Sequence, residues 1–410
     1  MRRPSEWHIG ARATRRRIIM HVGPTNSGKT YNAMQRLQTA ESGVYCGPLR
    51  LLAHEVYERF NSAGHLCNLI TGEDRRIRED VYVPLTSCTV EMVPLNQKLE
   101  VAVVDEIQMI ADPSRGWAWT HALLGLQAKE IHLCGEPTAI DLIKRICETL
   151  NEEVEVNEYE RLSPLQLADK SLNGNLKNIR KGDCIVTFSR EGIFGLKQEI
   201  EMQTGYRCAV IYGALPPETR AEQARLFNDP NSGYDVLVAS DAIGMGLNLN
   251  IRRVIFETME KFDGKAVRPL QTSQVKQIAG RAGRFQTAYA VGEATTLEKS
   301  DLPKLHRVMA TPQDNLKSAG LQPTVSTIEQ FAHQLPRMPY SQLLGQFEDM
   351  AKLDGRYFMC NFKDAKQIAE RIEDLDMLLP DRYMFCTSPA NVRDLIVVKN
   401  LYKVGAPVAV

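Results

Sequence analysis

The feature that most constrains this chain is an eight-residue motif between a short apolar run, residues 18–22, and a helix-like stretch, residues 31–38. The motif reads Gly23, Pro24, Thr25, Asn26, Ser27, Gly28, Lys29 and Thr30. A strand, a glycine-containing loop and a helix in this order predict a P-loop, in which backbone N–H groups at the start of the helix face a phosphate. Lys29 is expected to reach the β- and γ-phosphates, and Thr30 to give its hydroxyl to Mg²⁺. All eight residues are therefore predicted to bind a nucleotide.

Bulk properties restrict how a charged partner could bind. The chain has 410 residues, enough for two or three domains, and its formal net charge is zero. Nucleic-acid binding would therefore have to come from local patches.

The nine cysteines include no C-x-x-C pair, so we expect them to be reduced and buried rather than bound to zinc or paired in disulfides. No apolar run approaches the ~18 residues of a membrane-spanning helix, so no membrane partner is expected.

The chain alternates short apolar strands with amphipathic helices in two successive blocks. In the first block, strands are predicted at residues 43–46, 67–70, 101–104 and 130–134, and helices at 50–63 and 119–128. In the second block, strands are predicted at residues 184–188, 208–212, 234–239 and 253–257, and helices at 190–204 and 217–228. This alternation predicts the α/β class, with a helix-covered parallel sheet in each block. With a Ser-Pro turn near residue 164 and helical periods from residue 302, the expected domains are 1–160, 161–300 and a mainly helical region, 301–410.

Two carboxylates close the predicted strand at residues 101–104. Asp105 and Glu106 follow it directly, and a strand end beside a P-loop is where a Mg²⁺-binding aspartate belongs. Asp105 is predicted to hold the metal, and Glu106 to orient and deprotonate the attacking water. Acidic residues also follow many strands in ordinary turns that have no catalytic role. The prediction for Asp105 and Glu106 therefore depends on the presence of the P-loop.

Two arginines lie three residues apart near the end of the second block. Arg281 and Arg284 would share one face of a helix and could point into one cleft. A guanidinium suits the γ-phosphate oxygens and the spreading charge of a transition state. The alternative is a basic surface helix. If the arginines and the P-loop form one site, it lies between two domains, and nucleotide binding closes them.

A set of motifs in fixed order resembles a known family. Besides the P-loop and residues 105–108, the set comprises residues 47–50, 71–73, 89–92, 135–137, 188–190, 240–246 and 277–284. It resembles superfamily-2 helicases, which have two tandem RecA-like domains, and is similar to the RNA helicases of the mitochondrial degradosome. The resemblance extends from about residue 7 to residue 389.

The resemblance implies a role for each matching position. Lys29, Thr30, Asp105 and Glu106 would form the ATP–Mg²⁺ site, with Thr30 and Asp105 holding the metal. Gln108 and Glu136 would link hydrolysis to domain contact. Asp241 and Gly244 would approach the nucleotide from the second domain, and Gln277, Arg281 and Arg284 would face the γ-phosphate. The residues expected along the RNA path are Pro48, Arg50, Thr71, Gly72, Thr89, Ser189 and Ser240.

The family's activity follows as an expectation. It is ATP-driven 3′-to-5′ translocation on RNA and unwinding, in the mitochondrial matrix, which supplies RNA to degradation or surveillance. The substrate would be single-stranded RNA or a duplex with a 3′ overhang, and a 3′-to-5′ exoribonuclease is a candidate partner. An ATP-driven RNA clamp or remodeller without processive unwinding is the alternative. A single-domain P-loop switch or kinase would not explain the second block with its arginine pair.

Three departures from the family pattern affect these expectations. Ser240 stands where threonine is usual, although its hydroxyl remains. The family's N-terminal domain is expected to be missing because the P-loop begins at residue 23, and residues 391–410 do not resemble the family's continuation. These departures concern unwinding and partner docking rather than ATP hydrolysis.

Four further stretches carry weaker predictions. The first seventeen residues contain six arginines and one acid, which favours a surface strap that touches nucleic acid over a mitochondrial presequence. Residues 260–267 contain an Asp-Gly turn and predict a hairpin, either a duplex wedge or a simple connection. Residues 252–284 hold eight basic and three acidic residues, which is compatible with a backbone-tracking groove. Trp117 and Trp119 are expected to pack in a core rather than to stack on bases.

Overall fold

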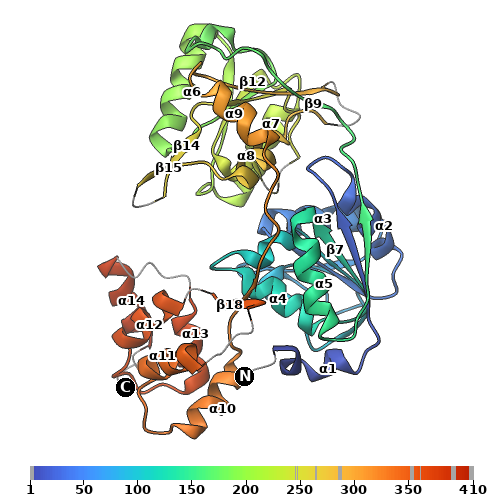
Figure 1. Cartoon of the computed structure of the whole chain (residues 1–410), viewed down its shortest axis with the longest axis vertical. Helices are drawn as coiled ribbons and strands as arrows, with labels where there is room; N and C mark the ends of the chain where they lie inside the picture. The colour runs from blue at the N-terminus through green and yellow to red at the C-terminus, as the bar shows by residue number, and fades with distance from the viewer. Residues whose placement is uncertain are drawn as a thin grey trace.

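The computed structural model describes residues 4–244, 246, 248–263, 266–284, 289–350, 355–360, 362–388 and 394–405. Two α/β domains lie one above the other, and a group of helices lies beside the lower, N-terminal domain (Figure 1). The expected class, two parallel-sheet domains followed by a mainly helical region, is confirmed.

The first domain is built on an eight-stranded sheet. Its strands are β1 (Arg17–Val22), β2 (Gly43–Gly47), β3 (Cys67–Ile70), β4 (Arg75–Arg76), β5 (Leu85–Thr89), β6 (Lys98–Val104), β7 (Gln127–Gly135) and β8 (Val154–Glu158). They lie in the order β4-β3-β5-β2-β6-β7-β1-β8, and every pair is parallel except β3 with β4. Strands such as β1 read as continuous apolar runs because helices cover both faces of a parallel sheet.

Helices cover the two faces of this sheet in separate cores. On one face lie α2 (Lys29–Gln38) and α3 (Arg50–Ser62), and on the other α4 (Gly116–Gly125) and α5 (Ile140–Glu148). Trp119 of α4 is fully buried and donates its Nε1–H to the backbone oxygen of Asp105 at 2.9 Å, which confirms the core prediction for this tryptophan. The helix predicted at residues 119–128 is wrong at its end, because Gln127 onward pairs with β6 and continues into the sheet as β7.

The second domain repeats the plan with six strands. They are β9 (Leu165–Leu167), β10 (Asp183–Val186), β11 (Arg207–Ile211), β12 (Tyr234–Ala239), β13 (Arg253–Phe256) and β16 (Gly292–Thr296), in the order β11-β12-β10-β13-β16-β9. One face is covered by α6 (Arg190–Thr204), and the other by α7 (Pro217–Asn228), α8 (Thr272–Ala279) and α9 (Leu302–Ala310). The hairpin expected near residue 260 forms as β14 (Glu260–Phe262) and β15 (Val267–Pro269); residues 264 and 265 at its turn lie outside the described residues.

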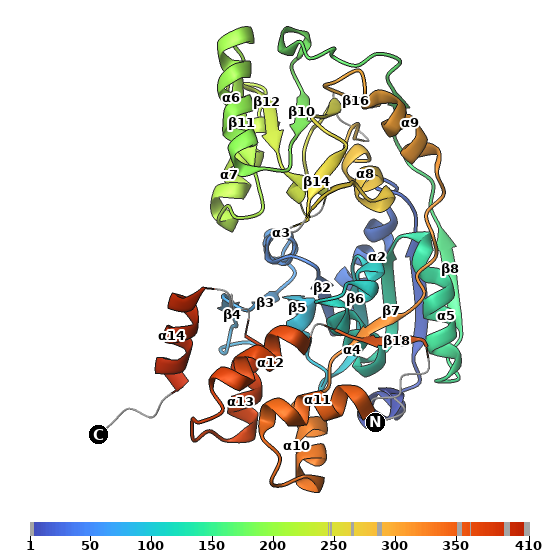
Figure 2. The same ribbon diagram turned by 60° about the vertical axis from the view of Figure 1, so that its left-hand side comes forward.

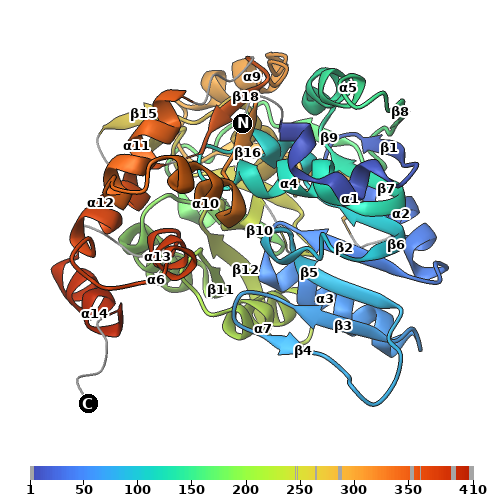
Figure 3. The same ribbon diagram turned by 90° about the horizontal axis from the view of Figure 1, so that it is seen from below.

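The last part of the chain is attached to the first domain. The short pair β17 (Ala319–Leu321) and β18 (Tyr357–Met359) contributes Ala319, Leu321 and Tyr357 to the first domain's core. Thr120 of α4 donates its hydroxyl to the Gly320 oxygen at 2.5 Å. Beside this sheet lie α10 (Val325–Gln334), α11 (Tyr340–Met350), α12 (Phe362–Arg371), α13 (Leu379–Cys386) and α14 (Leu395–Gly405). This group of helices lies below β3, β4 and β5 in Figure 2 and to the left of them in Figure 3.

Short helices complete the element order. One α-helical turn, α1 (Ile9–Arg12), precedes β1, and the 3₁₀ helices are η1 (Pro4–Trp7), η2 (Val90–Met92), η3 (Ile107–Ala111), η4 (Pro137–Ala139), η5 (Leu176–Asn178) and η6 (Asp241–Gly244). No helix in the described ranges is long and apolar enough to cross a membrane.

The N-terminal arginines correct one sequence-based prediction. Arg16 is buried; it pairs with Glu152 at 2.6 Å and donates to the oxygens of Leu123 and Leu126. Arg12 donates to the oxygen of Leu124 at 2.7 Å. These two side chains fasten the segment to the end of α4, so their guanidiniums are not a surface strap for nucleic acid. The expected burial of the cysteines is confirmed for all nine.

Candidate nucleotide and RNA site

A cavity of about 380 Å³ separates the two domains. From the first domain it is lined by residues 25–30 of the P-loop, Asp105, Glu106 and Glu136. From the second domain it is lined by Gly244, Gln277, Arg281 and Arg284. The P-loop and the two acids follow the carboxyl ends of parallel strands β1 and β6, which is where open α/β sheets bind ligands.

The P-loop forms a backbone cradle between β1 and α2. Asn26 and Gly28 have positive φ angles of 61° and 75°, so the chain turns sharply before the helix begins at Lys29. Gly23 packs so closely that a Cβ there would lie 2.5 Å from the Tyr159 oxygen. The Ser27 hydroxyl is buried and has no hydrogen-bond partner among the described residues. This orphaned hydroxyl, with the exposed start of α2, is the chemistry that a phosphate group would satisfy.

Two neighbouring carboxylates form the acidic end of the cavity. Asp105 accepts hydrogen bonds from the Thr30 hydroxyl at 3.3 Å and from the Tyr45 hydroxyl at 3.0 Å. Burial, and then the charge of Glu106, raise the pKa of Asp105 to about 6. Glu106 has a φ of 52°, a left-handed conformation that is costly for a residue with a Cβ and is typical of functional sites. Together Thr30 and Asp105 provide the hard oxygen ligands that suit Mg²⁺.

A chain of hydrogen bonds joins these acids to the second domain. Gln108 donates its amide N–H to Glu106, and its Oε1 accepts the backbone N–H of Glu136 at 3.1 Å. The Glu136 side chain accepts from Nε2 of Gln277 at 2.9 Å. Burial raises the pKa of Glu136. Residues predicted to link hydrolysis to domain contact thus lie in one continuous chain across the interface.

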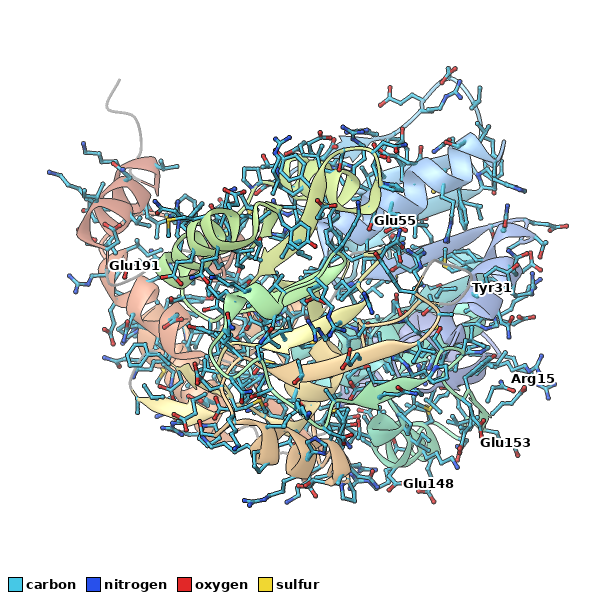
Figure 4. All side chains as sticks on the ribbon, turned by 90° about the horizontal axis from the view of Figure 1, so that it is seen from above. Arg15, Tyr31, Glu55, Glu148, Glu153 and Glu191 are labelled. Carbon is cyan, nitrogen blue, oxygen red and sulfur yellow. The ribbon has the colours of Figure 1, made fainter. Side chains whose placement is uncertain are left out.

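The arginine pair follows the end of α8. Arg281, which is half-buried, donates to the Gly244 oxygen through Nε at 3.1 Å, and desolvation lowers the pKa of its guanidinium. Arg284 shares the cavity with Glu55 of α3, a carboxylate to which Asn248 of the second domain donates. Glu55 is labelled where the ribbons of the two domains meet in projection, whereas Arg15, Glu148 and Glu153 lie along the outer edge (Figure 4).

Some predicted nucleotide residues lie away from the cavity wall. Gly23 and Pro24 are not among the described residues that line it. Asp241 is not either: its carboxylate pairs with Nζ of Lys261 at 2.5 Å and accepts from Nε2 of Gln274 at 2.9 Å. The sequence-based reasoning also missed lining residues of helices α2 and α3 that no motif marks, namely Tyr31, Met34, Leu52, Glu55, Val56 and Arg59.

A second cavity, of about 850 Å³, separates the first domain from the C-terminal helices. Four residues predicted to contact RNA line it: Pro48, Arg50, Gly72 and Thr89. The opposite wall includes Tyr340, Leu344 and Tyr383 of the helical region. Arg50 forms an ion pair with Glu73, the residue that follows Gly72 in the chain. Four of the five first-domain RNA candidates therefore share one cavity that needs the C-terminal helices to be complete.

The remaining RNA candidates lie elsewhere. Thr71 is buried, and its hydroxyl accepts the backbone N–H of Asp74 at 2.9 Å. On the second domain, Ser189 caps α6 by accepting from Gly192 N–H at 2.9 Å, and Ser240 accepts from Ala242 N–H at 3.1 Å.

At least two basic residues in the stretch 252–284 are paired with carboxylates. Arg253 is buried and paired with Asp183 in the sheet, and Arg268 pairs with Asp263 at 2.7 Å. A count of charges could not distinguish such partnered groups from open ones.

Three family models match the chain. One, described as the DEXQ-box helicase domain of Suv3, matches residues 4–159, and the helicase conserved C-terminal domain matches residues 167–286. Suv3 C-terminal domain 1 matches residues 367–403. The prediction that residues 391–410 diverge from the family is therefore wrong for residues 391–403.

Curated relatives match nearly the whole chain. The chain is 51% identical to the mitochondrial DExH-box ATP-dependent RNA helicase DExH18 of Arabidopsis thaliana, over 98% of this chain and 52% of that protein. It is 50% identical to the human mitochondrial ATP-dependent RNA helicase SUPV3L1, over 98% and 52%. The mitochondrial ATP-dependent RNA helicase SUV3 of Oryza sativa subsp. japonica is 48% identical, over 97% and 68%. The chain thus spans about half the length of most relatives that it matches.

Solved structures show the same fold at low identity. The Escherichia coli DEAH/RHA helicase HrpB matches with a TM-score of 0.58 at 14% identity, over 92% of this chain and 54% of that chain. Saccharomyces cerevisiae Dbp5 bound to RNA and ADP BeF3 matches with a TM-score of 0.51 at 14% identity, over 73% and 85%. The predicted arrangement of two tandem RecA-like domains is confirmed.

Proposed function

The chain belongs to the Suv3 family of DEXQ-box helicases, and from this premise we propose that it is an ATP-dependent RNA helicase. The observation that carries the proposal is the cavity between the domains, in which the P-loop and two acids of one domain face Arg281 and Arg284 of the other. A triphosphate held from two sides would bring the domains together, and its hydrolysis would release them.

The first domain supplies the residues for hydrolysis. The P-loop N–H groups, Lys29 and the buried Ser27 hydroxyl would bind the phosphates. Mg²⁺ would be held by Thr30 and Asp105 and would neutralise charge on the phosphate oxygens. Glu106 would accept a proton from the attacking water, and Gln108 fixes its carboxylate for that task.

The second domain supplies positive charge. Arg281 and Arg284 would stabilise the transferring phosphoryl group, as arginines do in P-loop enzymes generally. Gln277 would signal the state of the nucleotide to Glu136 through the hydrogen bond between them. Gly244 would lie near the nucleotide, whereas Asp241 would act through Lys261 and Gln274.

RNA would run through the cavity between the first domain and the C-terminal helices. Pro48, Arg50, Gly72 and Thr89 line it, Thr71 supports the loop beside it, and Ser189 and Ser240 would meet the strand on the second domain. In this proposal the enzyme moves 3′ to 5′ along single-stranded RNA or from a 3′ overhang. It acts in the mitochondrial matrix, where it supplies RNA for degradation or surveillance to a 3′-to-5′ exoribonuclease.

The hairpin of β14 and β15 is the candidate wedge for strand separation. It projects from the second domain on the side of the C-terminal helices (Figures 1 and 3). Phe262 and Val267 are 60% and 63% exposed on it, which leaves apolar side chains free to stack against an opening base pair. The alternative for the hairpin is an ordinary connection, and the alternative for the chain is an ATP-driven RNA clamp or remodeller without processive unwinding.

The test measures ATP turnover without nucleic acid, with single-stranded RNA and with DNA of the same sequence. We expect RNA to stimulate turnover more than DNA and Lys29→Ala to abolish it. Displacement of a labelled strand from duplexes with 3′ or 5′ overhangs then gives the polarity. Turnover without displacement would favour the clamp, and absence of RNA-stimulated turnover would contradict the proposal.

A further inference from the structure

The segment between the two domains is fixed to the first domain up to residue 162. The Tyr159 backbone N–H donates to the Val22 oxygen at 2.8 Å. The hydroxyl of Tyr159 lies 2.8 Å from Nδ1 of His21. The Tyr159 hydroxyl also accepts from Asn32 of α2 at 2.9 Å. The Leu162 N–H donates to the oxygen of Asn26 in the P-loop at 3.0 Å. Residues 159–162 therefore move with the P-loop.

Arg161 extends from this fixed segment to the second domain. Its Nη1 donates to the Thr25 oxygen at 2.9 Å and to the Gly280 oxygen at 2.8 Å. Its Nη2 donates to the Ala282 oxygen, and its Nε donates to the Ser163 oxygen at 2.5 Å. One guanidinium thus joins the P-loop, the linker and the loop that carries Arg281 and Arg284.

The P-loop itself makes a second connection to the same loop. Nδ2 of Asn26 donates to the Gly283 oxygen at 2.7 Å and to the Gly280 oxygen at 3.2 Å. The backbones approach so closely that a Cβ on Gly280 would lie 3.0 Å from Cβ of Thr25. The backbone position of the arginine loop is therefore defined relative to the P-loop by Arg161 and Asn26.

The groups around the Arg161 side chain suit the charge and the shape of a guanidinium. The carbonyls of Gly280 and Ala282 lie just beyond the end of α8, where the helix dipole favours a positive charge. Each of these hydrogen bonds ends on a backbone carbonyl, so the charge is balanced by dipoles and not by a carboxylate. A lysine presents three donors on a point charge, and it cannot reproduce the planar fork of a guanidinium.

We propose that Arg161 is a positioning residue for ATP hydrolysis, which holds the loop with Arg281 and Arg284 at the P-loop. The inference rests on the proposed ATPase function and adds a residue that acts from the linker. Arg161 is not among the described residues that line the nucleotide cavity, so it is expected to act through its hydrogen bonds and not through contact with the phosphates. It therefore contributes to turnover more than to nucleotide affinity.

The test uses the full chain with Arg161→Gln and Arg161→Lys. Because misplacement by about 1 Å can cost 10²-fold in rate, we expect Arg161→Gln to lower the kcat of RNA-stimulated ATP hydrolysis by about 10²-fold. Arg161→Lys should retain an intermediate rate. Affinity for a fluorescent ADP should stay within about twofold, whereas affinity for ADP with aluminium fluoride, which needs both arginines, should fall about as much as kcat.

The matched control is Arg145→Gln. Arg145 also donates to backbone carbonyls, those of Leu316 and Lys317, but it lies on α5 away from both cavities. This variant should keep the wild-type kcat. Unfolding temperatures of all variants show whether the substitutions affect the fold.

Two results would overturn the positioning role. One is a kcat of Arg161→Gln equal to that of the wild type. The other is an equal loss of affinity for ADP and for ADP with aluminium fluoride together with a lower unfolding temperature, which would indicate a merely structural arginine. A wild-type protein without ATPase activity would instead contradict the proposed function itself, so the two failures are distinguishable.

Discussion

The two RecA-like domains share one architecture but divide the chemistry unequally. The first presents Lys29 and Thr30 at the start of α2 and Asp105 and Glu106 directly after β6, and it also carries the C-terminal helices through β17 and β18. The second has its own core and reaches the cavity with side chains of α8 and of the loop after it. The difference suggests that the first domain and the helical region form one body that holds both ligands, and that the second domain is the part that moves.

The largest expected effect tests the contribution of the second domain. Arg284→Ala should lower kcat by about 10³-fold, or about 4 kcal/mol, because an arginine that stabilises the transferring phosphoryl group is lost. Nucleotide affinity should change much less, since the P-loop remains intact. Steady-state turnover and fluorescent ADP binding measure the two quantities. An unchanged kcat would mean that this arginine does not serve the reaction, and the comparison between the domains would fail.

The next effect tests whether the second domain unfolds on its own. Arg253 and Asp183 form a buried ion pair at 2.6 Å, with side-chain exposures of 8% and 0%. Asp183→Ala leaves a buried charge without its partner and should lower the free energy of unfolding of this domain by about 3 kcal/mol.

Calorimetry of the full chain checks that result. The transition of the second domain should move to lower temperature while that of the first stays in place. Glu222→Ala, which removes the exposed pair with Arg225, is the control and should change stability by less than about 0.5 kcal/mol. A shift of both transitions together would show that the domains unfold as one unit.

A smaller effect is the pH dependence of stability that comes from the histidines. Residues 161–300 contain no histidine, so this effect is expected in the first domain and not in the second. Burial, and then the charge of His8, lower the pKa of His121 to about 4. The unfolded chain therefore takes up this proton first as pH falls, and the contribution of neutral His121 to the stability of the first domain is lost between about pH 6.5 and pH 4.

His121→Gln should remove part of this loss. We expect the free energy of unfolding to depend less on pH, by up to about 3 kcal/mol over that range. Denaturant unfolding at several pH values measures it, with probes on each domain. If the variant and the wild type have the same pH profile, the histidine is not held neutral in the folded state.

The smallest effect concerns the hairpin. Lys261 of β14 pairs with Asp241 of η6, and Gly244 at the end of η6 accepts from Arg281. Lys261→Ala should reduce strand displacement several-fold and change RNA-stimulated turnover by less than about twofold, because it loosens the hairpin without altering the cavity. An equal loss of both activities would assign the pair to the ATPase cycle rather than to a wedge.

Most strands made of consecutive apolar residues were predicted from the sequence. The prediction failed where a strand buries polar side chains. Strand β16 was missed because it reads Gly-Glu-Ala-Thr-Thr; its buried Thr295 and Thr296 satisfy their hydroxyls on the oxygens of Lys170 and Glu298. The end of α4 was misplaced because an apolar stretch suits a buried helix and a buried strand equally.

The motif residues of the candidate site were identifiable from sequence because phosphate chemistry demands particular side chains at particular spacings. Residues 25–30 of the P-loop, the acidic pair and the arginine pair all line one cavity. Arg161 gave no such signal, because its partners are backbone carbonyls, which every residue type carries. The partnership of Asp241 with Lys261 was equally hidden, since it depends on how a hairpin folds back on η6.

The sequence by itself therefore determined the fold class, the family and the chemistry at each strand end, because local spacing encodes all three. Only the tertiary structure decided which groups face one another across domains, which arginines are anchors and which helices complete the second cavity, through which we propose that RNA runs. These depend on contacts between residues more than a hundred positions apart, for which neither periodicity nor a short motif contains information.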